Sequence, residues 1–70
     1  MIYFFLKDGQ FLQCEVHPGR PHVFRVVEPK GTEQTEEYSS TADLQARCDS
    51  LRVGLTQGGW TGPFGRDSRV

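Results

Sequence analysis

Hydrophobic and polar residues follow a strand-like pattern over the first 38 positions. Stretches rich in aromatic and β-branched residues are separated by glycine and proline, and they cover residues 1–7, 10–17, 22–28 and 32–38. Short runs bounded by turn residues are typical of antiparallel strands joined by hairpins. Gly9 and Gly31 stand where a hairpin turn needs a positive φ, and Pro29 suits the first position of a turn. The pattern predicts a four-stranded antiparallel meander.

After residue 38, the spacing of the apolar residues becomes that of a helix. Hydroxyl side chains at residues 39–41 offer N-cap oxygens, and an aspartate falls in the first turn. Apolar residues then recur at spacings of four, three and four, which places one narrow stripe on a helix: Leu44, Cys48, Leu51 and Leu55. The predicted helix begins near Thr41 and ends near Gln57. Gly58 and Gly59 supply its left-handed C-cap.

These elements predict one α+β domain over residues 1–60. Its ββββ meander is followed by one amphipathic helix, which packs on one face of the sheet. Residues 61–70 contain glycine, proline and arginine without apolar periodicity, so we expect a flexible tail there. With 70 residues, of which 36% are hydrophobic, the chain has only a small core. A partner subunit, a metal or a disulfide would add stability to a chain of this size.

The turn at Asp8-Gly9 decides which side chains of the first two strands face the helix, because side chains alternate along a strand. A two-residue turn pairs Phe5 with Leu12. Four apolar residues then lie on the face away from the helix: Ile2, Phe4, Leu6 and Phe11. A three-residue turn with a glycine bulge instead places Tyr3, Phe5 and Phe11 on the face away from the helix. We favour the three-residue turn, because it groups the aliphatic side chains against the leucine stripe of the helix.

In either register, large apolar side chains remain on the face of the hairpin that the helix does not cover. The fourth strand is polar on both faces and indicates a solvated edge. Either the tail covers the apolar face, or a protein partner does, most simply a second copy of the chain. We favour a partner and expect a non-catalytic interaction module that forms a homo-oligomer or docks on another protein. The predicted interaction face comprises Tyr3, Phe5, Phe11, Trp60 and Phe64.

The charge balance argues against a general nucleic-acid binder. Eight Lys and Arg residues stand against nine Asp and Glu, which gives a formal net charge of −1, whereas such binders are usually strongly basic. Aromatic side chains on a sheet with nearby cations do form sites for single-stranded nucleic acid. This is the alternative function, and its phosphate contacts would be Lys7, Arg20, Arg25, Arg66 and Arg69.

The residues give no strong pattern for catalysis or metal binding. The residue types of a Cys2His2 zinc site occur at Cys14, His17, His22 and Cys48. However, Cys14 and His17 are an odd number of positions apart on one strand and point to opposite faces. Both thiols lie in apolar patterns, which do not favour a reactive thiolate, and we expect a disulfide between them only on air oxidation. We therefore expect no enzyme activity, no metal and no cofactor.

The apolar start of the chain, Met1 to Leu6, is too short for a membrane span and lacks the basic residues that begin a signal peptide. We therefore expect no membrane contact. Without a secretory signal, the two cysteines are interpreted as reduced thiols. The expected location is the cytoplasm.

Overall fold

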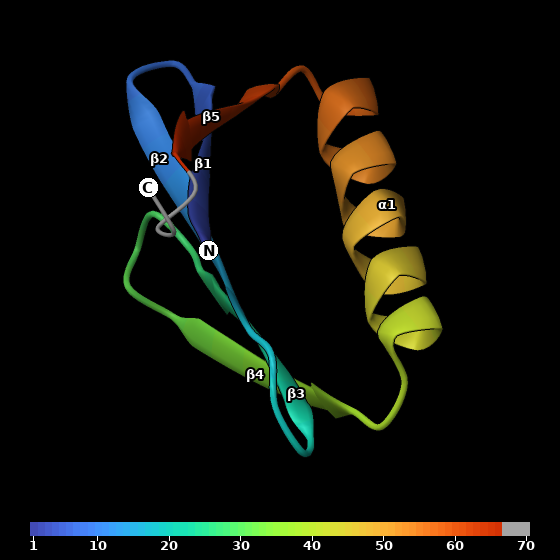
Figure 1. Ribbon diagram of the computed structural model, residues 1–70. Helices are drawn as coiled ribbons and strands as arrows, with labels where there is room; N and C mark the ends of the chain where they lie inside the picture. Colours follow the sequence, from blue (N-terminus) through green and yellow to red (C-terminus); the bar gives the residue numbers. More distant parts are fainter. Residues whose placement is uncertain (67–70) are drawn as a thin grey trace.

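The fold is a five-stranded antiparallel sheet with one helix across one face. The structure, a computed structural model, describes residues 1–66. Its elements are β1 (Ile2–Lys7), β2 (Gln10–His17), β3 (His22–Val27), β4 (Glu33–Tyr38), α1 (Thr41–Gln57) and β5 (Thr61–Arg66). The strand order is β4-β3-β2-β1-β5. The helix lies along the inner face of the twisted sheet, and no helix within residues 1–66 covers the outer face (Figure 1). The predicted α+β class, with a four-strand meander followed by one helix, is confirmed.

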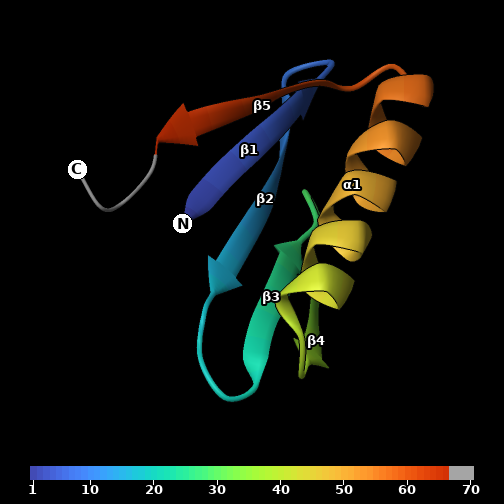
Figure 2. The ribbon, with the colours of Figure 1, turned by 45° about the vertical axis from the view of Figure 1, so that its right-hand side comes forward.

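The fifth strand is the element that the sequence pattern did not predict. Residues 61–66, which we assigned to the tail, form β5 and pair antiparallel with β1. Figure 2 shows the chain leaving the end of α1 and returning along β1. Because Gly62, Pro63 and Gly65 interrupt the segment, it shows no alternation of apolar and polar residues. The rest of the expected tail, residues 67–70, lies outside the described residues.

The hairpin between β1 and β2 has a two-residue turn, so the three-residue turn that we favoured is wrong. Lys7 pairs with Gln10 across the turn, and Asp8 and Gly9 have φ values of 52° and 76°. Two successive positive φ values are typical of a type I′ turn, whose twist matches that of the flanking strands. This register pairs Phe5 with Leu12 and directs both toward the inner face.

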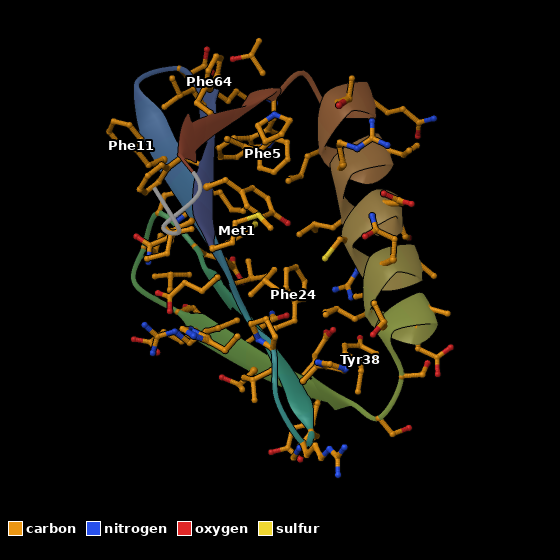
Figure 3. All side chains as sticks on the ribbon, in the orientation of Figure 1. Met1, Phe5, Phe11, Phe24, Tyr38 and Phe64 are labelled. Carbon is orange, nitrogen blue, oxygen red and sulfur yellow. The ribbon has the colours of Figure 1, made fainter. Side chains whose placement is uncertain are left out.

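The core lies between the inner face and α1. It consists of seven buried residues, Phe5, Leu12, Cys14, Val16, Phe24, Val26 and Leu44. Figure 3 shows Phe5 and Phe24 on the side of the sheet that faces α1, and Phe11 on the other side. Of the predicted helix stripe, only Leu44 is fully buried, while Cys48, Leu51 and Leu55 are half-buried against the core. The helix therefore rests on the sheet through a narrow contact.

The ends of α1 agree with the predicted ones. Ser40 is the N-cap, and its hydroxyl accepts a hydrogen bond from the amide of Asp43 at 3.1 Å. At the other end, the amide of Trp60 donates to the carbonyl of Leu55 at 2.9 Å. Lys7 then donates from Nζ to the carbonyl oxygen of Gly58 at 2.7 Å. The end of β1 is thereby tied to the end of the helix.

We predict that Gly62 is a position where alanine disrupts β5. Gly62 has a φ of +139°, and an added Cβ would lie 2.8 Å from the carbonyl oxygen of Phe4 and 3.0 Å from Cδ2 of Phe5. Gly62→Ala is expected to lower the free energy of unfolding by about 2–4 kcal/mol, since the strained φ and the overlap add. Chemical denaturation measures this loss. Hydrogen exchange should increase most at the amides of residues 61, 62, 64 and 65, since Pro63 has no amide hydrogen.

Gly9→Ala is the matched control for Gly62→Ala. Gly9 also has a positive φ, +76°, but an added Cβ would meet nothing within 4 Å. Gly9→Ala should therefore lower the free energy of unfolding only through the strain of the left-handed backbone, by about 1–2 kcal/mol. Equal losses for the two variants would mean that the contact between β5 and β1 is not tight.

Candidate functional site

The outer face of the sheet carries a cluster of apolar side chains on β1, β2 and β5. Cross-strand pairing places Leu6 opposite Phe11 and Phe4 opposite Phe64. The rings of Phe4 and Phe11 meet edge to face, with centroids 6.2 Å apart. Phe11 is 60% exposed and Phe64 is 48% exposed. We call this cluster the outer apolar patch, and it consists of Ile2, Phe4, Leu6, Phe11 and Phe64.

A polar cluster borders the outer apolar patch and is centred on Glu15, which is buried. The carboxylate of Glu15 contacts Nε2 of His17 at 2.9 Å and Nη2 of Arg25 at 2.9 Å, and it also accepts a hydrogen bond from Gln13. Arg25 makes a second ion pair with Glu33 at 3.1 Å. The hydrogen bonds from His17 and Arg25 lower the pKa of Glu15 to about 2 despite its burial. The two carboxylates, Glu15 and Glu33, share the one guanidinium of Arg25, so the cluster has a small net negative charge.

The predicted interaction residues are divided by the structure. Phe11 and Phe64 do lie exposed on the outer face. Phe5, in contrast, is 1% exposed in the core, and Tyr3 is half-buried against it, so their assignment to the outer face is corrected. The two-residue turn is the physical reason, because it reverses the faces of β1. Trp60 is half-buried, also packs on the core, and does not belong to the outer apolar patch.

Sequence reasoning missed three members of the outer apolar patch in the register that it favoured: Ile2, Phe4 and Leu6. The two-residue register, the alternative given by the sequence, places all three there. The signal that identifies this register is the dipeptide Asp8-Gly9, since Asp-Gly is among the preferred sequences of a type I′ turn.

The residues predicted to contact nucleic acid do not form one surface. Lys7 is bonded to the carbonyl of Gly58, and Arg25 is paired with two glutamates. Arg20 lies in the exposed loop between β2 and β3. The side chain of Arg66 and the whole of Arg69 lie outside the described part of the structure. Of the predicted nucleic-acid contacts whose side chains the structure describes, Lys7 and Arg25 are therefore already engaged within the chain.

The two cysteines and the nearby histidines occupy different environments. Cys14 is buried on the inner face, whereas His17 contacts Glu15 on the outer face, as the odd spacing predicted. Within residues 1–66, no group of three or more potential metal ligands comes together. Cys14 and Cys48 are both free thiols. Burial raises the pKa of Cys14 to about 11, and the neighbouring Cys48 adds to the shift. The Cys14 thiol is therefore protonated at neutral pH.

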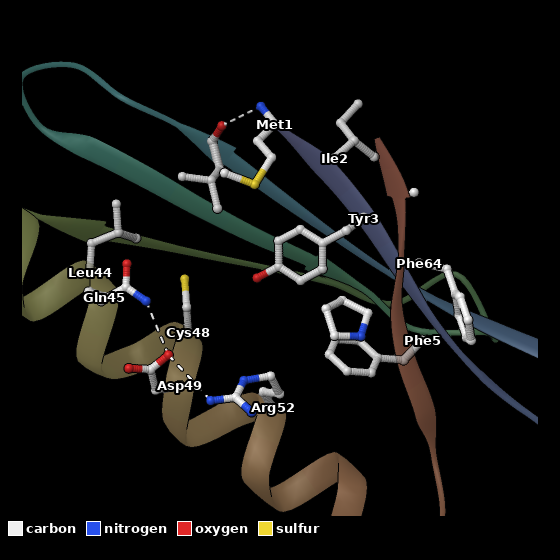
Figure 4. A pocket seen from close by; sticks show the side chains of 13 residues that line it. Met1, Ile2, Tyr3, Phe5, Leu44, Gln45, Cys48, Asp49, Arg52 and Phe64 are labelled. Atoms are coloured by element: carbon white, nitrogen blue, oxygen red, sulfur yellow. Dashed lines mark hydrogen bonds and ion pairs between the residues drawn. The ribbon is translucent and has the colours of Figure 1, made fainter. Parts of the chain in front are cut away.

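A pocket of about 340 Å³ opens between α1 and the strands β1 and β5 (Figure 4). Apolar side chains from the sheet and α1 line it, among them Tyr3, Phe5, Val16 and Leu44. Cys48 lies opposite Tyr3, and the Tyr3 hydroxyl points toward it (Figure 4). Burial, together with the neighbouring thiols, raises the pKa of Tyr3. The Tyr3 hydroxyl is therefore protonated at neutral pH. Met1 also lines the pocket, and its N-terminal ammonium donates to the carbonyl oxygen of Val16 at 3.0 Å.

No protein-family model, curated protein or solved structure matches this chain. Over residues 1–66, no helix is both long and apolar enough to cross a membrane. Two features of the described residues remain as candidate sites: the outer apolar patch and the pocket beside α1.

Proposed function

We propose that this chain is a non-catalytic interaction module that forms a homodimer through the outer apolar patch. The observation that carries the proposal is the exposure of Phe11 and Phe64 on the sheet face that α1 does not cover. Single exposed apolar side chains are common on monomers, but a contiguous cluster on adjacent strands is typical of an interaction surface. Large aromatic side chains also contribute most of the binding energy at many interfaces.

The chemistry of the outer face favours a second copy over a charged partner. No member of the outer apolar patch is charged, and the neighbouring groups of Glu15, Arg25 and Glu33 pair with one another. The face therefore offers little net charge to attract an acidic or basic protein. In a two-fold dimer the same patch meets itself, so an apolar surface is matched by an equally apolar one.

The titratable groups support a non-catalytic role. The Glu15 carboxylate is saturated by three side-chain donors and holds its charge in a structural ion pair. The Cys14 thiol is fully buried and protonated at neutral pH, which does not favour nucleophilic chemistry. Free thiols fit a reducing compartment, so we place the module in the cytoplasm as part of the same proposal.

Replacing Phe11 or Phe64 by serine is expected to weaken self-association by at least about tenfold, because each removes an exposed aromatic side chain from the centre of the proposed interface. Sedimentation equilibrium over a range of protein concentrations measures the dissociation constant. Val53→Ser is the matched control, since Val53 is 47% exposed on α1, away from the outer face. The helical circular dichroism of all three variants should match that of the unmodified chain.

Two results would contradict the homodimer. The first is a chain that stays monomeric at the highest accessible concentration. The second is a dimer that Phe11→Ser, Phe64→Ser and Val53→Ser weaken equally, because the interface would then lie elsewhere.

Single-stranded nucleic acid is the alternative partner, and the geometry supports it less. Phe4 and Phe11 supply exposed or half-exposed rings, but Lys7 and Arg25 already have partners within the chain. Fluorescence anisotropy with short oligonucleotides separates the two functions. Binding that weakens steeply with salt and is lost in Phe11→Ser would favour nucleic acid over the dimer.

A further inference from the structure

The pocket beside α1 exists because the helix makes a narrow contact with the sheet. Leu44 is the buried helix residue, whereas Cys48 one turn later is only half-buried and faces the pocket. On the other side, Tyr3 and Phe5 form the wall from β1, and Pro63 and Phe64 form it from β5. Figure 4 shows Tyr3, Leu44 and Cys48 directed into the same space. An apolar space with few polar groups is the usual character of a small-molecule site.

The rim of the pocket is polar and belongs to one face of α1. Gln45, Asp49 and Arg52 line it at spacings of four and three residues. Gln45 donates from Nε2 to Oδ1 of Asp49 at 3.1 Å. Arg52 approaches the same oxygen only to 3.8 Å, which is too long for a hydrogen bond, and its side chain is 51% exposed. Arg52 therefore forms only a long, exposed ion pair with Asp49, and a ligand carboxylate that reaches the rim can replace Asp49 as its partner.

The volume of the pocket limits the size of its ligand. At about 30 Å³ for each water-sized group, a pocket of about 340 Å³ holds roughly eleven such groups, about the size of a chain of eight carbons with a carboxylate. We propose that this pocket binds a small aliphatic carboxylate, with its chain against Tyr3 and Leu44 and its carboxylate paired with Arg52. The pocket shares Ile2 and Phe64 with the outer apolar patch, so the two proposals are separated at residues that belong to only one of them: Phe11 for the dimer and Arg52 for the pocket.

Octanoate is the probe for this site, and 1-octanol is the same chain without the charge. Titration of the purified, isotope-labelled chain is followed by NMR of its amides. Octanoate is expected to shift the amides of Tyr3, Cys48 and Arg52 to saturation. Arg52→Gln should weaken octanoate binding by about two- to fivefold, the range of an exposed ion pair, and leave octanol binding unchanged. Arg20→Gln, which removes a cation from an exposed loop, is the matched control. It should change neither the affinity for octanoate nor the affinity for octanol.

A second measurement needs no substitution and tests the location of the ligand. Cys48 lines the pocket and is half-buried, whereas Cys14 is fully buried. Octanoate is expected to slow the alkylation of Cys48 by iodoacetamide in proportion to the fraction of chain bound, as read by mass spectrometry.

Three results would overturn the proposal. They are the absence of saturable octanoate binding, an alkylation rate of Cys48 that octanoate does not change, and equal effects of Arg52→Gln and Arg20→Gln on octanoate affinity. None of them bears on the dimer, which is tested at Phe11. A monomeric chain that binds octanoate would in turn reject the dimer and keep the pocket.

Discussion

Phe5→Ala is expected to lower the free energy of unfolding by about 3–5 kcal/mol, the usual cost of removing a buried phenylalanine ring. Phe5 is 1% exposed, and its ring meets that of Tyr3 edge to face at 6.0 Å. At about 0.05–0.15 kcal/mol per residue, a chain of this length has a total stability of about 4–10 kcal/mol. The variant should therefore be largely unfolded in moderate urea. Circular dichroism during urea denaturation measures the change.

Phe11→Ala is the control on the neighbouring strand. Phe11 is 60% exposed, so its removal should cost the monomer no more than about 1 kcal/mol. Both variants are compared at protein concentrations below the dissociation constant of the dimer, because self-association adds to apparent stability. A large loss at Phe11 together with a small loss at Phe5 would show that the first strand has the opposite register.

Acid is expected to destabilise the chain between about pH 5 and pH 2 through Glu15. The hydrogen bonds from His17 and Arg25 lower its pKa from an ordinary value of 4.5 to about 2 in the folded chain. A lowered pKa means that the unfolded chain binds the proton first, so the stabilisation is present above pH 5 and disappears as the pH falls. Because His17 and Arg25 are themselves partly exposed, the loss should be about 2–3 kcal/mol. Denaturation at a series of pH values measures it.

Glu15→Gln tests the origin of this acid sensitivity. The amide cannot carry the charge that pairs with Arg25, so the variant should be less stable at pH 7 and should lose less stability between pH 5 and pH 2. Glu33→Gln is the matched control, since Glu33 also pairs with Arg25 but its side chain is 53% exposed. Glu33→Gln should keep the steep loss of stability between pH 5 and pH 2. A Glu15→Gln chain with the same profile as the unmodified chain would assign the acid sensitivity to another group.

The elements that depend on local signals could be predicted from the sequence. Glycine and proline separate the first four strands, and the spacing of Leu44, Cys48, Leu51 and Leu55 identifies the helix. The cap at Ser40 follows from the hydrogen-bonding capacity of its hydroxyl. Each of these signals is complete within a few residues, so no knowledge of tertiary contacts is needed.

The candidate site was harder to predict, because it depends on a single turn and on distant contacts. We weighted the grouping of aliphatic side chains above the local preference of Asp8-Gly9, and this placed Tyr3 and Phe5 on the wrong face. The pairing of β5 with β1 joins residues about 60 positions apart and has no local pattern. The pocket likewise arises only when β1, β5 and α1 meet.

The position of β5 has a consequence for the chain during its synthesis. β1 is an internal strand of the described sheet, but one of its two neighbours, β5, is translated after the other four described strands and α1. Until residues 61–66 leave the ribosome, a nascent hairpin of β1 and β2 presents the unpaired backbone of β1 beside its exposed phenylalanines. An open edge next to apolar side chains is prone to pair with other chains. When β5 arrives, it pairs with β1 and closes that edge within the same chain.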